Sequence, residues 1–145
     1  MANKRSEEFD TVLANHDLDC LIIGRTPVGI DASPRRLRET ENIANSLFQV
    51  TTGINANLMM ACRRFSPHAV QVIVANSEES SIGNDVEWPL LCYQAQLSIG
   101  ACAGQGLIYK TVDSWVDHKP DSLDIDLDAR LVRTRFLQQH VAVFE

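Results

Sequence analysis

The most informative stretch of the chain runs from Asp85 to Gly106, and it carries no charge after Glu87. Its pattern predicts one helix that holds Pro89 in the first turn and ends at Gly104 or Gly106, since glycine caps a helix without strain. We expect other protein to cover such an uncharged segment on most sides. Because the chain has only 145 residues, part of that cover is expected to come from another copy of itself.

Two serines mark the predicted starts of further helices. Ser6 precedes an apolar stripe at helical spacing: Phe9, Val12, Leu13 and His16. Ser33 precedes a proline, which the first turn of a helix tolerates. The helix after it has apolar residues roughly on one face: Leu37, Ile43, Ala44, Leu47 and Phe48. Its end, residues 47–52, also fits a strand.

Four segments have the apolar pattern of strands. Residues 18–24 contain a continuous apolar run after Asp19, typical of a strand buried on both faces. Residues 69–75 are rich in β-branched side chains and make the clearest strand. Residues 107–112 and 140–144 complete the set. The pattern leaves 57–65 and 129–137 open between helix and strand, and we favour a strand for 58–62.

These elements predict an α+β fold in which two or three helices pack on a mostly antiparallel sheet. The length favours a single compact domain over residues 1–145. The order of elements resembles that of small ring-forming neck and tail subunits of virions. This is a likeness of fold, which by itself implies no function.

Composition narrows the function classes. The net charge of -6 argues against a general nucleic-acid binder. The charged share of 22% is slightly low, which favours a surface partly covered by a partner. No apolar run is long enough to span a membrane, and the first residues lack the apolar region of a secretory signal. We therefore expect a cytoplasmic protein, or part of a particle assembled in the cytoplasm, that is not secreted.

Cysteines, histidines and glycines form no convincing cofactor or metal site. The four cysteines lie in apolar runs without a C-x-x-C motif, so buried free thiols in a reducing compartment are expected. The four histidines are scattered, which disfavours metal ligation. Gly100, Gly104 and Gly106 follow a predicted helix, whereas a phosphate loop precedes one. We expect close packing there, and no cofactor.

Arginines cluster along the chain and leave two interpretations open. Ion pairs with nearby acidic residues, within or between subunits, are the simpler one. Because arginine binds carboxylates and phosphates at two points, an anion site is the alternative. Its candidate residues are Arg35, Arg36, Arg63, Arg64, Arg133 and Arg135.

Three alternating aspartates, Asp124, Asp126 and Asp128, are expected on the solvent face of an edge strand, where their charge discourages stray pairing. They fail the calcium-loop pattern, because Ala129 and Phe136 stand where glycine and glutamate are needed. A half-exposed tryptophan is a good interface anchor. The predicted interface residues are Trp88, Tyr93, Gly100, Gly104, Trp115, Asp124, Asp126 and Asp128.

Three functional hypotheses follow. The first is a non-catalytic, self-associating structural or adaptor subunit of a homo-oligomer, because no catalytic frame accompanies the uncharged segment. The second is a small enzyme or sponge that binds an anionic metabolite or nucleotide through the clustered arginines. The third is a chaperone or inhibitor of another protein, which would dock on the acidic residues. The expected partners are therefore other copies of the chain or a second protein, with neither membrane nor nucleic acid.

Overall fold

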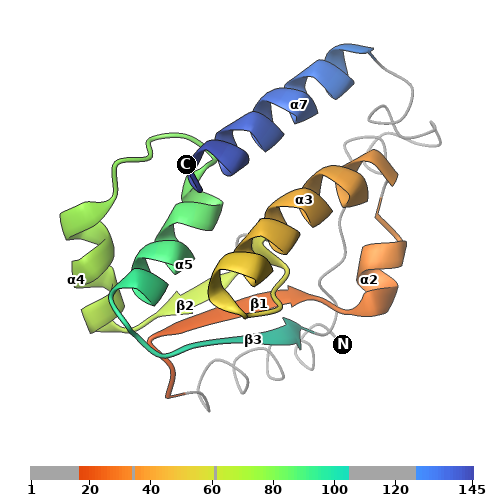
Figure 1. Cartoon of the computed structure of the whole chain (residues 1–145). Coiled ribbons are helices and arrows are strands. Elements are labelled where there is room, and N and C mark those ends of the chain that lie inside the picture. Colours follow the sequence, from red (N-terminus) through yellow and green to blue (C-terminus); the bar gives the residue numbers. More distant parts are fainter. Residues whose placement is uncertain (1–16, 34, 61, 105–126) are drawn as a thin grey trace, which may run out of the picture.

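The computed structural model describes residues 17–33, 35–60, 62–104 and 127–145. Within them, α3, α4 and α5 lie on one side of a three-stranded sheet, and α7 lies over α3 and α5, away from the sheet (Figure 1). The described elements are β1 (Cys20–Arg25), α2 (Pro27–Asp31), α3 (Arg35–Thr52), η1 (Leu58–Met60), β2 (Arg63–Phe65), α4 (Pro67–Asn76), α5 (Asn84–Gln94), β3 (Ile99–Gly104) and α7 (Leu127–Ala142).

The predicted α+β class is confirmed, with five α-helices in the described residues where the pattern predicts two or three. The strand order is β2-β1-β3. β1 pairs antiparallel with β2, placing Cys20 opposite Phe65, and parallel with β3, placing Cys20 opposite Ile99. The described sheet is thus mixed. Every residue of β1 is buried, as the apolar run 18–24 predicts.

Helix α3 follows Ser33 and the adjacent proline, as predicted, and the strand alternative for 47–52 is wrong. Leu37, Ala44 and Phe48 are buried along one face of the helix. Ile43 belongs to the predicted apolar face, yet it is exposed. The buried face is therefore narrower than the sequence pattern implies.

Residues 69–75 form most of helix α4, so the prediction of a strand there is wrong. The Ser66 hydroxyl oxygen accepts the Ala69 N–H at 3.1 Å and caps the helix, with a proline next to the serine. Ala69 and Ile73, four residues apart, are buried on one side. Packing of this helical face outweighs the strand preference of the β-branched residues.

The stretch 85–106 is not one helix, which corrects the central prediction of the sequence. Helix α5 ends at Gln94, Gln96 has a positive φ of 58°, and β3 begins at Ile99. The small residues of β3 hydrogen-bond to β1 as a strand. A continuous helix would forgo this pairing, and the pairing is invisible in the local pattern.

Pro89 lies inside α5 and not in its first turn, because the helix begins at Asn84. A proline there cannot donate to the carbonyl of Asp85, four residues earlier. Instead, the Nη2 of Arg63 donates to that carbonyl oxygen at 2.8 Å. A contact from β2 thus satisfies the acceptor that the proline leaves open.

The C-terminal segment is helical. α7 settles 129–137 as helix, and it includes His140, so the strand predicted for 140–144 is wrong. The strand favoured for 58–62 is also wrong over η1, and β2 begins just after it. The helix predicted from Ser6 and the strand predicted for 107–112 lie outside the described residues.

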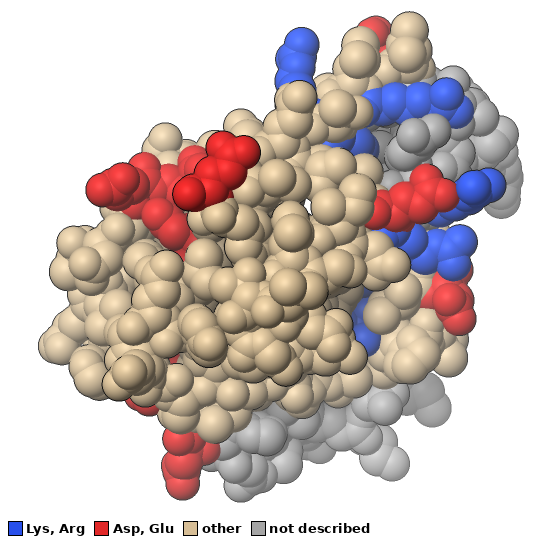
Figure 2. Space-filling model, in the orientation of Figure 1, with Lys and Arg blue, Asp and Glu red and all other residues tan. Residues whose placement is uncertain are grey.

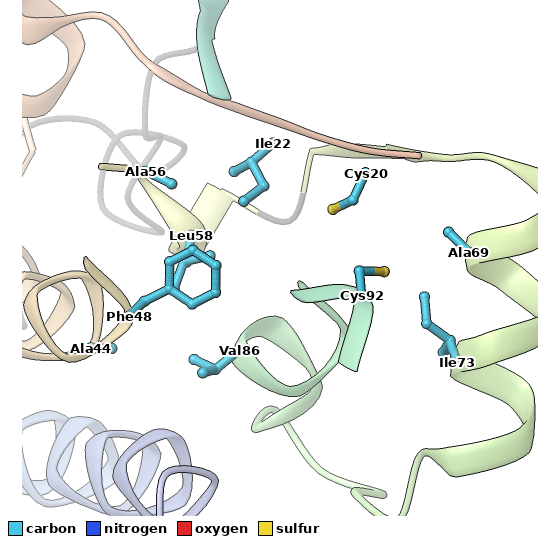
Figure 3. Close-up of a cluster of buried hydrophobic side chains, with 10 residues drawn as sticks. All are labelled: Cys20, Ile22, Ala44, Phe48, Ala56, Leu58, Ala69, Ile73, Val86 and Cys92. Carbon is cyan, nitrogen blue, oxygen red and sulfur yellow. The ribbon is translucent and has the colours of Figure 1, made fainter. Parts of the chain in front are cut away.

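Ten buried side chains form a core between the sheet and the helices (Figure 3). Phe48 of α3 lies against Leu58 of η1, with Ile22 of β1 and Val86 of α5 near it (Figure 3). Toward α4, Cys20 of β1 and Cys92 of α5 lie near Ala69 and Ile73 (Figure 3). The full set is Cys20, Ile22, Ala44, Phe48, Ala56, Leu58, Ala69, Ile73, Val86 and Cys92.

We expect Phe48→Ala to lower the free energy of unfolding by about 3–5 kcal/mol, because it leaves a cavity among packed side chains. Urea denaturation followed by circular dichroism measures this change. The control is Val74→Ala on α4, where the valine is 78% exposed. It should change stability by about 0.5 kcal/mol or less. Equal effects of the two substitutions would contradict the assigned core.

Candidate functional site

A buried arginine at the end of β1 joins four parts of the fold. Arg25 is only 3% exposed. Its Nη1 donates to the Ser33 hydroxyl oxygen at 2.7 Å, its Nη2 pairs with the Glu41 carboxylate, and its Nε donates to the Asn57 side-chain oxygen at 3.4 Å. Burial raises the pKa of Glu41 above its ordinary 4.5, and the Arg25 charge opposes that rise. Because its guanidinium is buried and contacts these three partners, we assign Arg25 a structural role.

A second buried ion pair joins β2 to α5. The Nη1 of Arg63 donates to the Asp85 carboxylate at 3.0 Å, and both side chains are mostly buried. The Nη2 of Arg63 also donates to the backbone oxygens of Leu58 and Asp85. Breaking such a pair would leave an uncompensated charge inside the protein.

Helix α7 turns polar side chains inward. The Nη2 of Arg133 donates to the Thr40 hydroxyl oxygen at 3.0 Å. The Nε2 of His140 lies 3.1 Å from the carbonyl oxygen of Ile82, and because a carbonyl only accepts, the imidazole donates there. Burial lowers the pKa of His140 below 6.5, while the charge of Asp85 works in the opposite direction.

The arginines proposed as an anion site lie on three different elements. Arg63 and Arg133 have the inward partners described above. Arg35, on α3, is exposed and donates to Glu39 at 2.8 Å. Arg64, on β2, donates to the carbonyl of Leu18 at 3.4 Å. Arg135 is exposed on α7, and the side chain of Arg36 lies outside what the structure describes.

Some of the predicted interface residues are also engaged within the chain, while others are exposed or lie outside the described residues. Trp88 is half-buried, its ring meeting Phe65 edge to face and its Nε1 donating to the Ser77 hydroxyl oxygen at 3.2 Å. Tyr93 is exposed on α5. A Cβ added to Gly100 would lie 2.5 Å from a methyl carbon of Leu18, so this close approach occurs within the chain. Gly104 is buried, and Asp128 is exposed at the start of α7. Trp115, Asp124 and Asp126 lie outside the described residues.

An exposed face without charge is the feature that sequence reasoning missed. No lysine, arginine, aspartate or glutamate occurs from Asn42 to Cys62, yet much of this segment faces solvent. Figure 2 shows a broad uncharged area over the middle of the visible face, with charged side chains gathered around it. The sequence does show this feature, because residues 42–62 separate Glu41 from Arg63 without any charged residue between them. The exposed members of this face are Asn42, Ile43, Ser46, Gln49, Val50, Thr51, Gly53 and Asn55.

Two grooves flank the exposed ridge of α3. The polar groove, of about 550 Å³, includes Asn45, Gln49 and Asn55 in its lining, together with charged residues that precede the uncharged segment: Asp31, Arg35, Arg38, Glu39 and Glu41. The apolar groove, of about 480 Å³, includes Ile43 and Leu47. Three exposed residues line both grooves and so lie between them: Glu39, Asn42 and Ser46.

A third groove, of about 380 Å³, lies between α5, the end of α7 and the loop after α4. Its lining includes three acidic residues: Glu78, Glu79 and Glu87. The Glu87 carboxylate accepts the Ser77 hydroxyl at 2.6 Å and the Glu78 N–H at 2.8 Å. Hydrogen bonds from Ser81 lower the pKa of Glu79. These acceptors hold their own loop in place.

No group of three metal-ligating side chains occurs in residues 17–33, 35–60, 62–104 and 127–145. The four cysteines are free thiols, with Cys20 and Cys92 fully buried. None of the described helices is both long and apolar enough to cross a membrane.

We expect Arg25→Met to lower the free energy of unfolding by about 3–5 kcal/mol, because the Glu41 carboxylate stays buried without its cation. Adding Glu41→Met should recover part of this loss, since the isolated charge is then removed. Arg35→Ala, which breaks an exposed ion pair on α3, is the control and should have little effect. Additive losses in the double variant would contradict this role of Arg25.

The buried imidazole predicts a pH dependence of stability. Because the folded pKa of His140 lies below 6.5, the unfolded chain binds more protons just below that pH. Stability present above pH 6.5 is therefore lost as the pH falls through the lowered pKa. Urea midpoints of the wild type should decline over this range more steeply than those of His140→Gln. His68→Gln, on the exposed part of α4, should follow the wild type; parallel curves for all three would refute the assignment.

Comparisons of the chain with protein-family models, curated proteins and solved structures found no match. Function is therefore inferred from the geometry of the described residues. In that geometry the buried ion pairs are structural, and the exposed uncharged face of α3 is the surface that calls for an explanation.

Proposed function

We propose that this chain is a non-catalytic, self-associating structural or adaptor subunit of a homo-oligomeric assembly. The observation that carries the proposal is the exposed face of residues 42–62, which has no ionisable acidic or basic side chain. Soluble protein surfaces usually intersperse charges of both signs. The core of a protein interface, in contrast, is depleted in charged residues.

The outer face of α7 supports the same proposal. Leu127, Leu131 and Val132 are exposed at 68%, 50% and 43%, beside the exposed Asp128 and Arg135. A surface helix normally turns its apolar residues toward the core. A single exposed leucine needs no explanation, but three exposed apolar side chains on one helix favour contact with further protein.

The contacts of the arginines weigh against the alternative of an anion-binding enzyme or sponge. Arg35 and Arg38 line the polar groove, but carboxylates lie beside them, at 2.8 Å for Glu39 and 3.6 Å for Asp31. An incoming anion would have to displace or approach these acids. Self-association makes no such demand on the groove.

We expect light scattering on the purified chain at tens of micromolar to give a mass of at least two chains of 16.2 kDa each. A uniform monomer at that concentration would contradict the proposal. A thermal-shift panel of nucleotides on the same sample separates the alternative. Stabilisation by a nucleotide that disappears in Arg35→Ala would favour the anion site, and an unchanged melting temperature would favour the structural role.

A further inference from the structure

We propose that two copies of this chain meet across a two-fold axis through the exposed ridge of α3, formed by Asn42, Ser46 and Val50. The inference rests on the proposed self-association and specifies its surface and symmetry. These three residues follow each other at intervals of four, so they form one row along the helix. All three are exposed, and Val50 reaches 86%.

The charges of the molecule favour this face for contact between identical copies. With a net charge of -6, two copies repel each other in most orientations. In a two-fold interface the same patch lies on both sides, so a charge near the axis meets its own kind. The ridge and the rest of residues 42–62 carry no charge, and Glu39, which lines both grooves, lies seven positions before Ser46 along the helix. This face therefore lets two acidic copies approach.

The side chains of the ridge and its flanks are also self-complementary. Asparagine and glutamine each have donors and an acceptor, and serine has both in one hydroxyl, so each can pair with its own kind. Asn42, Ser46, Gln49 and Asn55 supply such groups on the exposed face. Lysine or glutamate could not pair with itself in this way.

The shape of the face fits a ridge that enters a groove. One side of the ridge is the apolar groove, which includes Ile43 and Leu47, and the other is the polar groove. Packing of four-residue rows into each other's grooves is the commonest arrangement of two helices. With the helices antiparallel and the axis near Ser46, Val50 of each copy lies by the apolar groove of the other. The exposed valine and the exposed Ile43 then cover each other.

The experiment places one charge near the axis. We expect Ser46→Glu alone and Ser46→Lys alone each to weaken self-association by about tenfold or more, because each charge faces its own copy. An equimolar mixture of the two variants should restore association as a mixed pair. Glutamate and lysine have a higher helix propensity than serine, so α3 should keep its fold. Sedimentation measures the masses, and circular dichroism checks the helix content.

Gln71→Glu and Gln71→Lys on the exposed side of α4 are the matched controls, and both should associate as the wild type does. A monomeric wild type would refute the proposed function itself. An oligomeric wild type whose Ser46 variants associate unchanged would overturn only the α3 interface. Ser46 variants that dissociate alone and fail to associate when mixed would overturn the two-fold arrangement.

Discussion

The guanidinium of Arg25 is the contact on which the described fold depends. It lies at the end of the central strand. It contacts Ser33 just beyond α2, Glu41 of α3 and Asn57 before η1. The strand approaches that segment closely, since a Cβ added to Gly24 would lie 2.6 Å from the Cβ of Asn57. A buried charge tolerates few alternative positions, because each one would leave it without partners. This cation therefore ties α3 to the end of the central strand.

The described fold holds charged side chains inside and leaves apolar side chains exposed. The ion pairs of Arg25 and Arg63 are buried, and Arg133 and His140 donate hydrogen bonds from α7 toward the rest of the fold. Apolar and carboxamide side chains face solvent along α3, and three apolar side chains do so on α7. These exposed side chains are what the proposed contact with further copies would cover.

Parts of this arrangement could be predicted from local signals. The apolar run after Asp19 indicates a buried strand, and the serine-proline pair before α3 marks a helix start. The same pair precedes α4 at Ser66, and it should have outweighed the β-branched composition of 69–75. The candidate site could be anticipated only in part. The absence of charge in 42–62 is plain in the sequence, but its exposure depends on which face of α3 is buried.

The sequence by itself determined the α+β class, the central strand, the start of α3 and the scarcity of charge, because each depends on side chains within a few positions of one another. Only the tertiary structure decided that the segment after α5 becomes a strand, since its hydrogen-bond partners come from β1, about eighty residues earlier. It also decided which arginines are structural. An arginine looks the same in a sequence whether it meets a buried carboxylate or water, and only the packing of distant elements distinguishes the two.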